Sequence, residues 1–297
     1  MARSVLLGFA AVMLVAECAQ PAMAQQVGYL DRIELPATLP GGLSGLEITE
    51  TGNRLFAIGD RGQIVTARVE RDAEGMLGLS DLRVWPLRNP DGKEVHGLSA
   101  DAEGLALAED GTLFVSFEGR GRVWRYAEPG GPATYLPRHP DFDRLQTNSG
   151  LEALAVDARG RLYTLPERSG ALTRPFPVYR LAGGTWDQPF SVPRRGGFLP
   201  VGADIGPDGR FYLLERAFNG FSFRSRVRRF DLGETHLSGE VTLLETPLFA
   251  RGNLEGLSVW RDGSGVLRLT MVADDNFLSV LPGGLVEIVL DNSGRGL

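Results

Sequence analysis

The stretch "LEALAVDARGRLYTLPER", residues 151–168, decides the fold. It places an apolar segment, a turn at Arg159-Gly160 and a second apolar segment between two glutamates, Glu152 and Glu167. Glycine tolerates the positive φ that tight hairpin turns need, and short apolar runs suit buried strands. The stretch therefore predicts a β-hairpin with a carboxylate near each of its outer ends.

The same hairpin recurs along the chain at intervals of roughly fifty residues. A third apolar strand follows each hairpin, such as "RVWRY" at 122–126, and fainter fourth strands follow in most repeats, such as "EVTLLE" at 240–245. Turn-forming residues mark the five repeats: Thr51-Gly52-Asn53, Asp110-Gly111, Arg159-Gly160, Asp208-Gly209 and Asp262-Gly263.

Four antiparallel strands per repeat, at this period, are typical of a β-propeller blade. The sequence therefore predicts an all-β protein with five blades. The fifth repeat lacks a fourth strand, and we expect residues 27–35, "VGYLDRIEL", to supply it and close the ring. Six blades would result if residues 70–100 or the C-terminal segment held a degenerate blade. A β-sandwich and an open β-solenoid are the alternative architectures.

The N-terminus has the pattern of a secretory signal peptide. Arg3 precedes an apolar run over residues 5–15, and Ala22-Met23-Ala24 forms a cleavage site of small residues. We predict a signal peptide over residues 1–24 and a single propeller domain over residues 25–297. The one cysteine lies in the signal peptide, so the mature chain has no disulfide. The expected location is the periplasm, with the extracellular space as second choice.

Composition and motifs exclude several classes of function. The net charge is −6, which argues against nucleic acid as a partner, and no later stretch is long and apolar enough to span a membrane. The sequence contains no G-x-S-x-G elbow, H-E-x-x-H helix, P-loop or dinucleotide fingerprint. We expect a monomer that binds a small ester or phosphate.

The acids that flank the hairpins are expected to gather at one mouth of the ring. The two strands of a hairpin are antiparallel, so the start of the first and the end of the second lie on the same face, opposite the turn. In three repeats an acid on the first strand of the hairpin stands eight residues before the turn glycine. Further acids stand at the end of the second strand, after that glycine. The two sets are Glu103, Glu152 and Glu255, and then Asp60, Glu118, Glu167, Glu215, Asp274 and Asp275.

Two repeats depart from this pattern. Ser44 and Val201 hold the position of the first glutamate, whereas Glu47 and Asp204 come three residues later. Successive side chains on a strand alternate between its faces, so an odd offset directs a side chain to the opposite face unless a β-bulge intervenes.

Crowded carboxylates need compensating positive charge. Two of them about 4 Å apart repel by roughly 4 kcal/mol at an effective dielectric constant near 20. Carboxylate and amide oxygens without clustered His or Cys favour Ca²⁺ over zinc or copper. The sequence therefore predicts a divalent cation, most suitably Ca²⁺. Its expected ligands are Asp60, Glu103, Glu152, Glu255, Asp274, Asp275 and Asn276.

Basic and aromatic residues are expected around the same mouth. The loops after the second strands of the third and fourth repeats are long, "RSGALTRPFP" at 168–177 and "RAFNGFSFRSR" at 216–226. Arginine can hold a phosphate or carboxylate through two parallel hydrogen bonds. The substrate-binding residues expected at this mouth are Arg61, Asn148, Arg174, Phe218, Arg224 and Asn253.

Five ordered segments resemble the successive motifs of a known family. They are "GGLSGLEI", "DAEGLALAEDGTLFVSFEG", "NSGLEALAVDARGRLYTLPER", "ADIGPDGRFYLLERAF" and "NLEGLSVWRDGSGVLRLTMVADDNF", between about Gly41 and Leu290. This order is similar to that of the phytase-like family, also called esterase-like activity of phytase. The resemblance implies a secreted or periplasmic propeller that hydrolyses phosphate or other esters. Because the chain has a single lysine and no basic run, a smaller ester suits it better than inositol hexakisphosphate.

The leading hypothesis is a metal-dependent esterase or phosphoesterase. The cation would polarise the ester, one of Glu118, Glu167 or Glu215 would act as general base, and Arg168 or Arg216 would stabilise the developing anion. One alternative is a calcium-dependent lactonase in which His96 acts at the metal. A second alternative is a non-catalytic propeller that binds a ligand or a protein partner.

Overall fold

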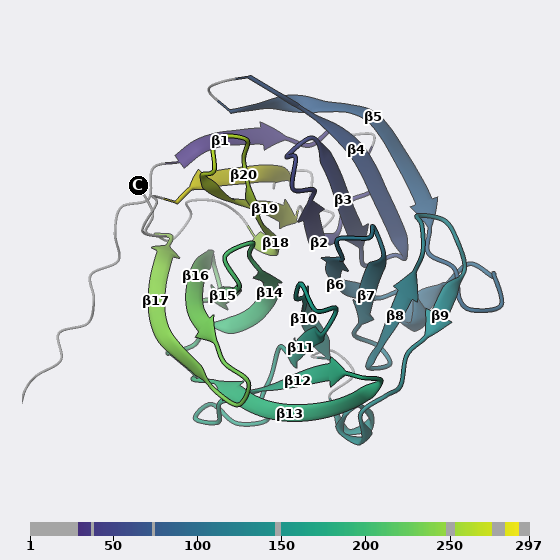
Figure 1. The fold of residues 1–297 in the computed structure, drawn as a ribbon, viewed down its shortest axis with the longest axis vertical. Coiled ribbons are helices and arrows are strands. Elements are labelled where there is room, and N and C mark those ends of the chain that lie inside the picture. Colours follow the sequence, from purple (N-terminus) through teal and green to yellow (C-terminus); the bar gives the residue numbers. More distant parts are fainter. Residues whose placement is uncertain are drawn as a thin grey trace, which may run out of the picture.

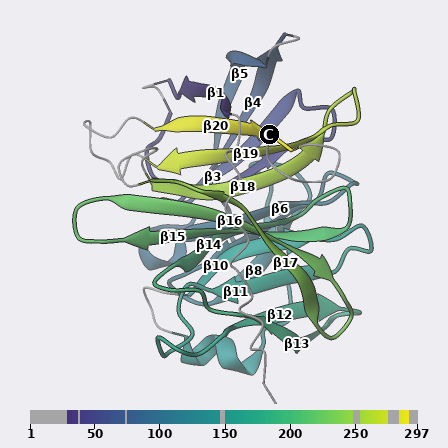
Figure 2. The ribbon, with the colours of Figure 1, turned by 90° about the vertical axis from the view of Figure 1, so that its left-hand side faces the viewer.

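The computed structural model describes residues 29–36, 39–72, 75–145, 150–247, 253–274 and 283–290. Five antiparallel sheets, each of four strands, stand in a ring around a central axis (Figure 1). The protein is thus a five-bladed β-propeller, as the repeats predict, and not a six-bladed one, a sandwich or a solenoid. Figure 2 shows the ring edge-on, with the strands running between two faces that carry the loops. No helix of the described residues is long and apolar enough to cross a membrane.

Four blades are consecutive repeats and the fifth takes its outer strand from the N-terminal part of the chain; the first strand of each repeat lies nearest the axis (Figure 1). Two short 3₁₀ helices, η1 (Gly97–Ser99) and η2 (Pro140–Arg144), precede the second and third blades. The first blade contains β2 (Leu43–Ile48), β3 (Arg54–Gly59), β4 (Gln63–Arg71) and β5 (Met76–Pro86), and the second contains β6 (Ala102–Leu107), β7 (Leu113–Phe117), β8 (Arg122–Tyr126) and β9 (Ala133–Tyr135). The third contains β10 (Leu151–Val156), β11 (Leu162–Pro166), β12 (Phe176–Ala182) and β13 (Thr185–Val192), and the fourth contains β14 (Leu199–Ile205), β15 (Arg210–Phe218), β16 (Phe223–Leu232) and β17 (Leu237–Glu245). The fifth contains β18 (Asn253–Arg261), β19 (Leu267–Asp274), β20 (Gly284–Val289) and β1 (Tyr29–Glu34).

The N-terminal strand closes the ring, as predicted. β1 is the outer strand of the fifth blade and pairs antiparallel with β20, with Ile33 opposite Leu285. A buried ion pair joins this blade to the first one, because Arg71 of β4 donates to both carboxylate oxygens of Glu287 on β20 at 2.8 Å. The first and last repeats are therefore held together by backbone pairing and by a two-point ion pair.

The hydrophobic core lies between the blades. Five buried clusters each combine side chains from two neighbouring blades, so every blade is covered on both faces. Between the first and second blades, for example, Ile58 packs with Val115 and Leu105. Full burial of one such aliphatic side chain contributes about 1.5–3 kcal/mol, so the stability of the ring comes chiefly from contacts between repeats.

Glycines let the inner strands approach one another around the axis. A Cβ atom added at Gly202 would lie 2.5 Å from the carbonyl oxygen of Glu255 in the next blade. Added Cβ atoms at Gly45, Gly104 and Gly256 would also lie under 3.0 Å from the backbone of the neighbouring blade. We call these four residues the glycine collar. These close contacts explain why glycine holds this position in four of the five inner strands.

All five inner strands carry an irregularity at the same place. The register with the second strand shifts at Ser44, Glu103, Glu152, Val201 and Glu255, which are the positions that hold the first acid of each repeat or its replacement. A bulge of this kind adds one residue to the strand, so side chains three positions apart can face the same side.

Candidate active site

The first three blades have the same backbone geometry at one face of the ring, which we call the mouth. The amide N–H of Asp60, Glu118 and Glu167 donates to the carbonyl oxygen just before or at the start of the adjoining inner strand, at 2.9–3.2 Å. The second strands therefore end side by side with the beginnings of the inner strands. This local geometry presents their terminal acids at the same face of the propeller.

The fourth blade carries an arginine at this equivalent position. Glu215 lies opposite Pro200, just before the bulge, which is the place that Phe117 and Pro166 take in the second and third blades. Arg216, one residue later, therefore corresponds to Glu118 and Glu167. Arg216 also stands seven residues after its turn glycine, as Glu118 and Glu167 do, whereas Glu215 stands six after it.

Glu215 lies in a different environment from the one expected for a mouth acid. Its fully buried carboxylate accepts hydrogen bonds from Arg226 Nε at 2.8 Å and from Arg228 Nε and Nη2 at 2.7 and 2.6 Å. Adjacent residues on a strand face opposite sides, so Arg216 takes the mouth side and Glu215 the interblade side. Glu215 thus joins the fourth blade to the chain near Arg195, whose carbonyl oxygen accepts from Arg226.

A cluster of three carboxylates lies at the mouth end of the second blade. Carboxylate oxygens of Asp101, Glu103 and Glu118 all lie within 4.8 Å of one another. Glu103 is an expected metal ligand and Glu118 an expected base, whereas Asp101 was missed. Its sequence signal is weak, because it precedes β6 and no other repeat has an acid at that place.

Carboxyls from several blades act on one another at this mouth. Burial, the nearby charge of Glu255 and then those of the second-blade acids raise the pKa of Glu103 well above its ordinary value. Burial and the charges of Glu103 and Glu167 likewise raise the pKa of Glu152. The expected convergence therefore holds for the acids that we call the acidic mouth: Asp60, Asp101, Glu103, Glu118, Glu152, Glu167 and Glu255.

Glu118 interacts with two other acids of the mouth, and its carboxyl group can be protonated near neutral pH. Burial and the charge of Asp101 raise the pKa of Glu118 to about 7, and its carboxyl hydrogen-bonds both Asp101 and Glu152. Burial also raises the pKa of Asp101, although its hydrogen bond to Glu118 and the charge of Arg122 oppose this effect. The three hydrogen-bonded carboxyl groups of Asp101, Glu118 and Glu152 can therefore hold a proton near neutral pH.

Arg216 supplies the cation inside the acidic mouth. It pairs with Glu255, donates to Asn253 Oδ1 at 2.7 Å, and its Nη2 lies 3.7 Å from Glu167 Oε1. Burial alone would lower the pKa of Arg216, but the charges of Glu255 and the neighbouring glutamates raise it. Arg168 pairs with the other oxygen of Glu167 at 3.2 Å. Arginines therefore pair with Glu167 and Glu255 of the third and fifth blades, whereas the second blade contributes a cluster of three carboxylates.

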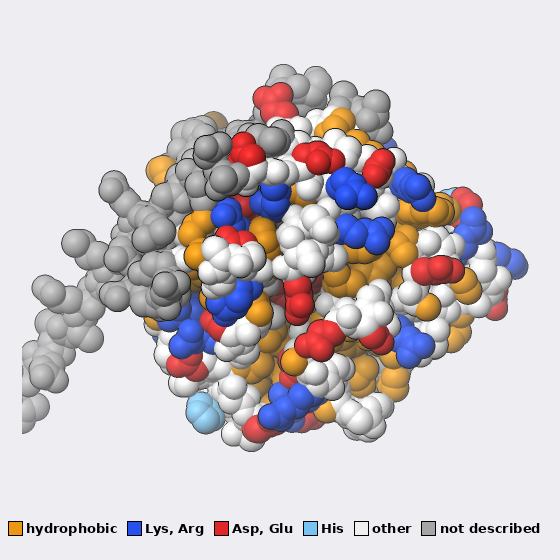
Figure 3. Space-filling model, turned by 45° about the horizontal axis from the view of Figure 1, so that its top comes forward, with side chains coloured by type: hydrophobic (Ala, Val, Ile, Leu, Met, Phe, Trp, Pro, Cys, Tyr) orange, Lys and Arg blue, Asp and Glu red, His pale blue; other side chains and the backbone are white. Residues whose placement is uncertain are grey.

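The other expected residues occupy the periphery or are not described. Arg61 and His96 are exposed, with His96 just before η1, and Phe218, the last residue of β15, is 60% exposed. Arg224 pairs with Glu245. Figure 3 shows acidic side chains near the middle of the ring, with basic ones around them. Asn148, Asp275 and Asn276 lie outside the described residues, as does the side chain of Asp274.

A second pair of acids lies deeper along the axis. Glu47 and Asp204 are 5% and 7% exposed, and their charges act on each other from the non-adjacent first and fourth blades. Ser258 of the fifth blade donates to Glu47 at 3.0 Å, and the Val259 N–H donates to Asp204 at 2.6 Å. The bulges explain this placement, because each acid follows its bulge by three residues and still faces the axis.

The donor set of the second blade fits a hard divalent cation. Ca²⁺ takes roughly six to eight oxygen ligands, often from carboxylates, and Asp101, Glu103 and Glu118 each offer a carboxylate oxygen to one site. Burial, and then repulsion between carboxylates, raises the pKa values of Glu103 and Glu118, and a bound cation would offset both effects.

Solved structures show the same fold in proteins of distant sequence. An exo-beta-1,3-galactanase from Clostridium thermocellum matches with a TM-score of 0.55 and 12% identity, over 88% of this chain and 63% of that chain. A luciferin-regenerating enzyme matches with a TM-score of 0.50 and 12% identity, over 91% and 98% of the two chains. At these identities the likeness shows the fold alone. No curated protein matches the chain in sequence.

The family comparison covers most of the chain. The family model described as phytase-like, esterase-like activity of phytase, matches residues 38–277. This range includes four complete blades, the inner two strands of the fifth, and every acid of the mouth. The chain therefore belongs to the phytase-like family.

Proposed function

We propose that the protein is an exported, metal-dependent hydrolase that cleaves a phosphate or carboxylic ester at the acidic mouth. The observation that carries this proposal is the placement of the Asp101, Glu103 and Glu118 cluster beside Arg216 in one opening. The family's description as esterase-like supports the same reaction class. Export rests on the predicted signal peptide over residues 1–24, which lies outside the described residues, and the periplasm is the proposed location.

The second-blade cluster would hold the cation, for which Ca²⁺ is the most suitable choice. When bound, such an ion polarises an ester oxygen and lowers the pKa of a coordinated water. Asp101, Glu103 and Glu118 would provide its carboxylate ligands. This set shares Glu103 with the set expected from the sequence and adds Asp101 and Glu118.

Glu152 is the carboxyl best placed to take the proton from the attacking water. It hydrogen-bonds Glu118, and burial together with the charge of Glu103 raises its pKa well above the ordinary value. A carboxylate with a raised pKa is a stronger base at neutral pH. Glu167 and Glu215, the other bases considered, are both engaged by arginines.

Arg216 would stabilise the negative charge that develops on the ester. Its guanidinium is held in place by Asn253 and Glu255 from the fifth blade, so it would need little reorganisation during the reaction. Donors fixed in this way are effective because their geometry is set before the charge develops. Arg168, which is 56% exposed and anchored on Glu167, would orient the substrate from the rim.

The proposal is tested by hydrolysis of p-nitrophenyl phosphate and p-nitrophenyl acetate. We expect activity on one of these esters that EDTA abolishes and added Ca²⁺ restores. Activity unchanged by EDTA would show the metal mechanism to be wrong. Absence of turnover on both esters, with Ca²⁺ still raising the melting temperature, would favour the non-catalytic binding propeller.

Two conservative variants separate cation binding from proton transfer. Glu118→Gln is expected to weaken calorimetric Ca²⁺ binding and to lower activity. Glu152→Gln is expected to keep most Ca²⁺ binding while kcat falls by about 10²–10⁴-fold, the usual contribution of a general base. The exposed Glu109→Gln, which removes one charge at a hairpin turn, is the matched control. Equal loss of Ca²⁺ binding in both mouth variants would remove Glu152 from the role of base.

A further inference from the structure

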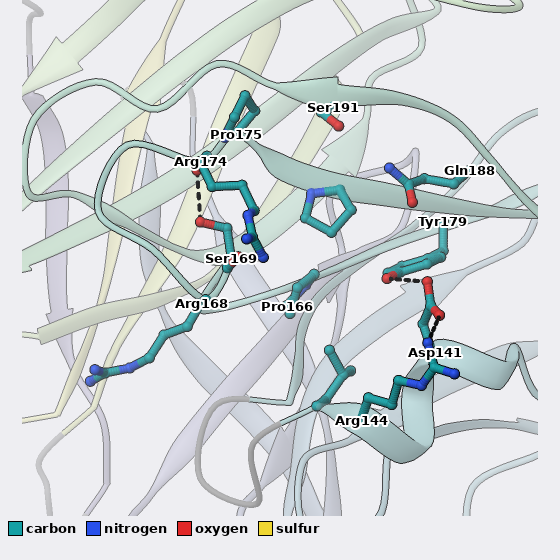
Figure 4. A pocket seen from close by; sticks show the side chains of 13 residues that line it. Asp141, Arg144, Pro166, Arg168, Ser169, Arg174, Pro175, Tyr179, Gln188 and Ser191 are labelled. Carbon is teal, nitrogen blue, oxygen red and sulfur yellow. Dashed lines mark hydrogen bonds and ion pairs between the residues drawn. The ribbon is translucent and has the colours of Figure 1, made fainter.

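A pocket of about 420 Å³ lies in the third blade, beside the acidic mouth (Figure 4). Its volume is within the range of roughly 300–1,000 Å³ that is usual for small-molecule sites. Strands β11, β12 and β13, helix η2 and the β11–β12 loop form its walls. We call it the blade-three pocket.

The end of β11 separates this pocket from the acidic mouth. Pro166 and Arg168 line the pocket, whereas Glu167 between them belongs to the acidic mouth. The division falls where β11 ends at Pro166 and the chain enters the β11–β12 loop. A molecule in the pocket would therefore lie one residue away from the proposed reaction centre.

The pocket combines an apolar surface with one available cation. Pro166, Pro177 and Tyr179 provide rigid or flat surface, and Figure 4 shows the Arg174 guanidinium over the space that they border. Arg168 extends away from this space in the same view. Proline and tyrosine faces suit a flat ring, which can stack on them with little loss of side-chain entropy.

The charges at the pocket leave Arg174 as the group that can bind an anion. Asp141 is the one acid among the described residues that line the pocket. Its carboxylate accepts from the Tyr179 hydroxyl at 3.3 Å and lies 3.8 Å from the Arg144 guanidinium, which offsets part of its charge. Within the described part of the chain Arg174 makes no ion pair; its Nη1 donates to the Ser169 carbonyl at 3.2 Å. A guanidinium with remaining donors is a suitable partner for phosphate or carboxylate.

Internal hydrogen bonds fix the loop that carries Arg174. The Ser169 hydroxyl is buried and lies 2.7 Å from the Arg174 carbonyl oxygen, which it can bind as a donor. Gly170 adopts a φ of +83°, and a Cβ there would lie 3.2 Å from Arg174 Nη1, so glycine allows the guanidinium to lie against the backbone. A preformed loop spares the ligand the entropic cost of ordering it.

We infer that the blade-three pocket binds the part of the substrate that does not react: a flat ring bearing one negatively charged group. The anion would contact Arg174, with Gln188 and Ser191 as further polar partners on β13, and the ring would lie on Pro166, Pro177 and Tyr179. The statement that this molecule is a substrate rests on the proposed function, whereas the statement that it binds in the pocket is independent of that function.

The test measures binding of phenyl phosphate by calorimetry to the whole protein in EDTA, with inorganic phosphate and phenol as separate probes. Phenyl phosphate is expected to bind more tightly than either half. Arg174→Gln should weaken its binding at least tenfold, whereas the exposed Arg125→Gln, with the same change in charge, should leave it unchanged. Ser191→Phe, which fills the pocket without changing charge, should abolish binding.

Equal binding of phenyl phosphate to wild type and Arg174→Gln would overturn the inference, and so would equal binding of phenyl phosphate and inorganic phosphate. Kinetics then distinguish this result from a failure of the proposed function. If the protein is a hydrolase, Arg174→Gln should raise KM about tenfold for 4-acetoxybenzoate, a flat ester whose carboxylate does not react, whereas Arg125→Gln should leave this KM unchanged. Arg174-dependent binding without any ester hydrolysis would retain the pocket and reject the hydrolase.

Discussion

Arg216 and Glu167 hold equivalent positions in neighbouring blades, and their side chains meet at the mouth with Arg216 Nη2 3.7 Å from Glu167 Oε1. One repeat of the ring thus carries a cation where the three preceding repeats carry carboxylates, Asp60, Glu118 and Glu167. This replacement makes the mouth asymmetric, with a carboxylate cluster at the second blade and an arginine paired with acids of the third and fifth blades. A substrate with a polar, charge-developing bond could be held between a metal ion and a guanidinium.

Removal of the Arg216 charge should lower catalytic activity more than it lowers the stability of the distant blades. Arg216→Gln is expected to lower kcat about 10²–10³-fold, as loss of an oxyanion-stabilising donor usually does. Arg216→Lys keeps the charge but not the forked geometry, so it should recover only part of the activity. Steady-state kinetics with Arg125→Gln as control would check this. Full activity in Arg216→Gln would exclude Arg216 from catalysis.

Calcium should stabilise the protein more strongly at alkaline than at acidic pH. Protons compete with the cation for Asp101, Glu103 and Glu118, whose pKa values are all raised, that of Glu118 to about 7. We expect the rise in melting temperature on adding Ca²⁺ to be small at pH 5 and to grow through pH 7 to pH 8. Differential scanning fluorimetry at fixed free Ca²⁺ measures this rise, and a rise independent of pH would place the ion elsewhere.

The deeper acids should make the metal-free protein less stable as pH rises. Burial raises the pKa of Asp204 from 3.8 to about 7, so between these values the folded state holds a proton that the unfolded state has released. The contribution is fully present below pH 3.8 and is lost as pH approaches 7. Glu47, whose pKa is raised by burial and by Asp204, acts in the same direction.

Glu47→Gln should therefore flatten this pH dependence. The amide cannot ionise, and it removes the repulsion on Asp204. At pH 8 the variant should exceed the wild type in unfolding free energy by on the order of 1 kcal/mol, since one pKa unit corresponds to about 1.4 kcal/mol. At pH 5 the two should be similar. Urea unfolding in EDTA, with Glu109→Gln as control, measures the difference. Parallel pH profiles for wild type and variant would contradict the prediction.

The glycine collar should tolerate no side chain. Gly202→Ala places a Cβ 2.5 Å from the Glu255 carbonyl oxygen, so the inner strands must separate, at a cost of about 1–3 kcal/mol. Gly78→Ala on β5 is the matched control, because nothing lies within 4 Å of its added Cβ. Thermal unfolding of both variants compares the two sites. Equal melting temperatures would show that the ring can widen freely at Gly202.

The sequence by itself determined the architecture. Turn glycines, apolar strands and their repeat period are local features, and they predicted five blades, their strand order and the closing role of residues 27–35. One turn was placed two residues early, because the fifth hairpin has its left-handed glycine at Gly265 and not at Gly263. The same repeats also predicted that Glu103, Glu118, Glu152, Glu167 and Glu255 would converge.

Only the tertiary structure decided which side chains share the mouth and in what state. The direction of a side chain depends on register, and a single-residue shift separates Arg216 in the mouth from Glu215 among buried arginines. The bulge in every inner strand brought Glu47 and Asp204 to the axis despite their odd offset, and the fold placed Asp101 beside Glu118. Burial raises the pKa values of these acids, and for Glu47 and Glu118 a charge on another blade adds to the effect. The physical reason is that register, bulges and burial are set by pairing between distant segments, which the period of the repeats does not encode.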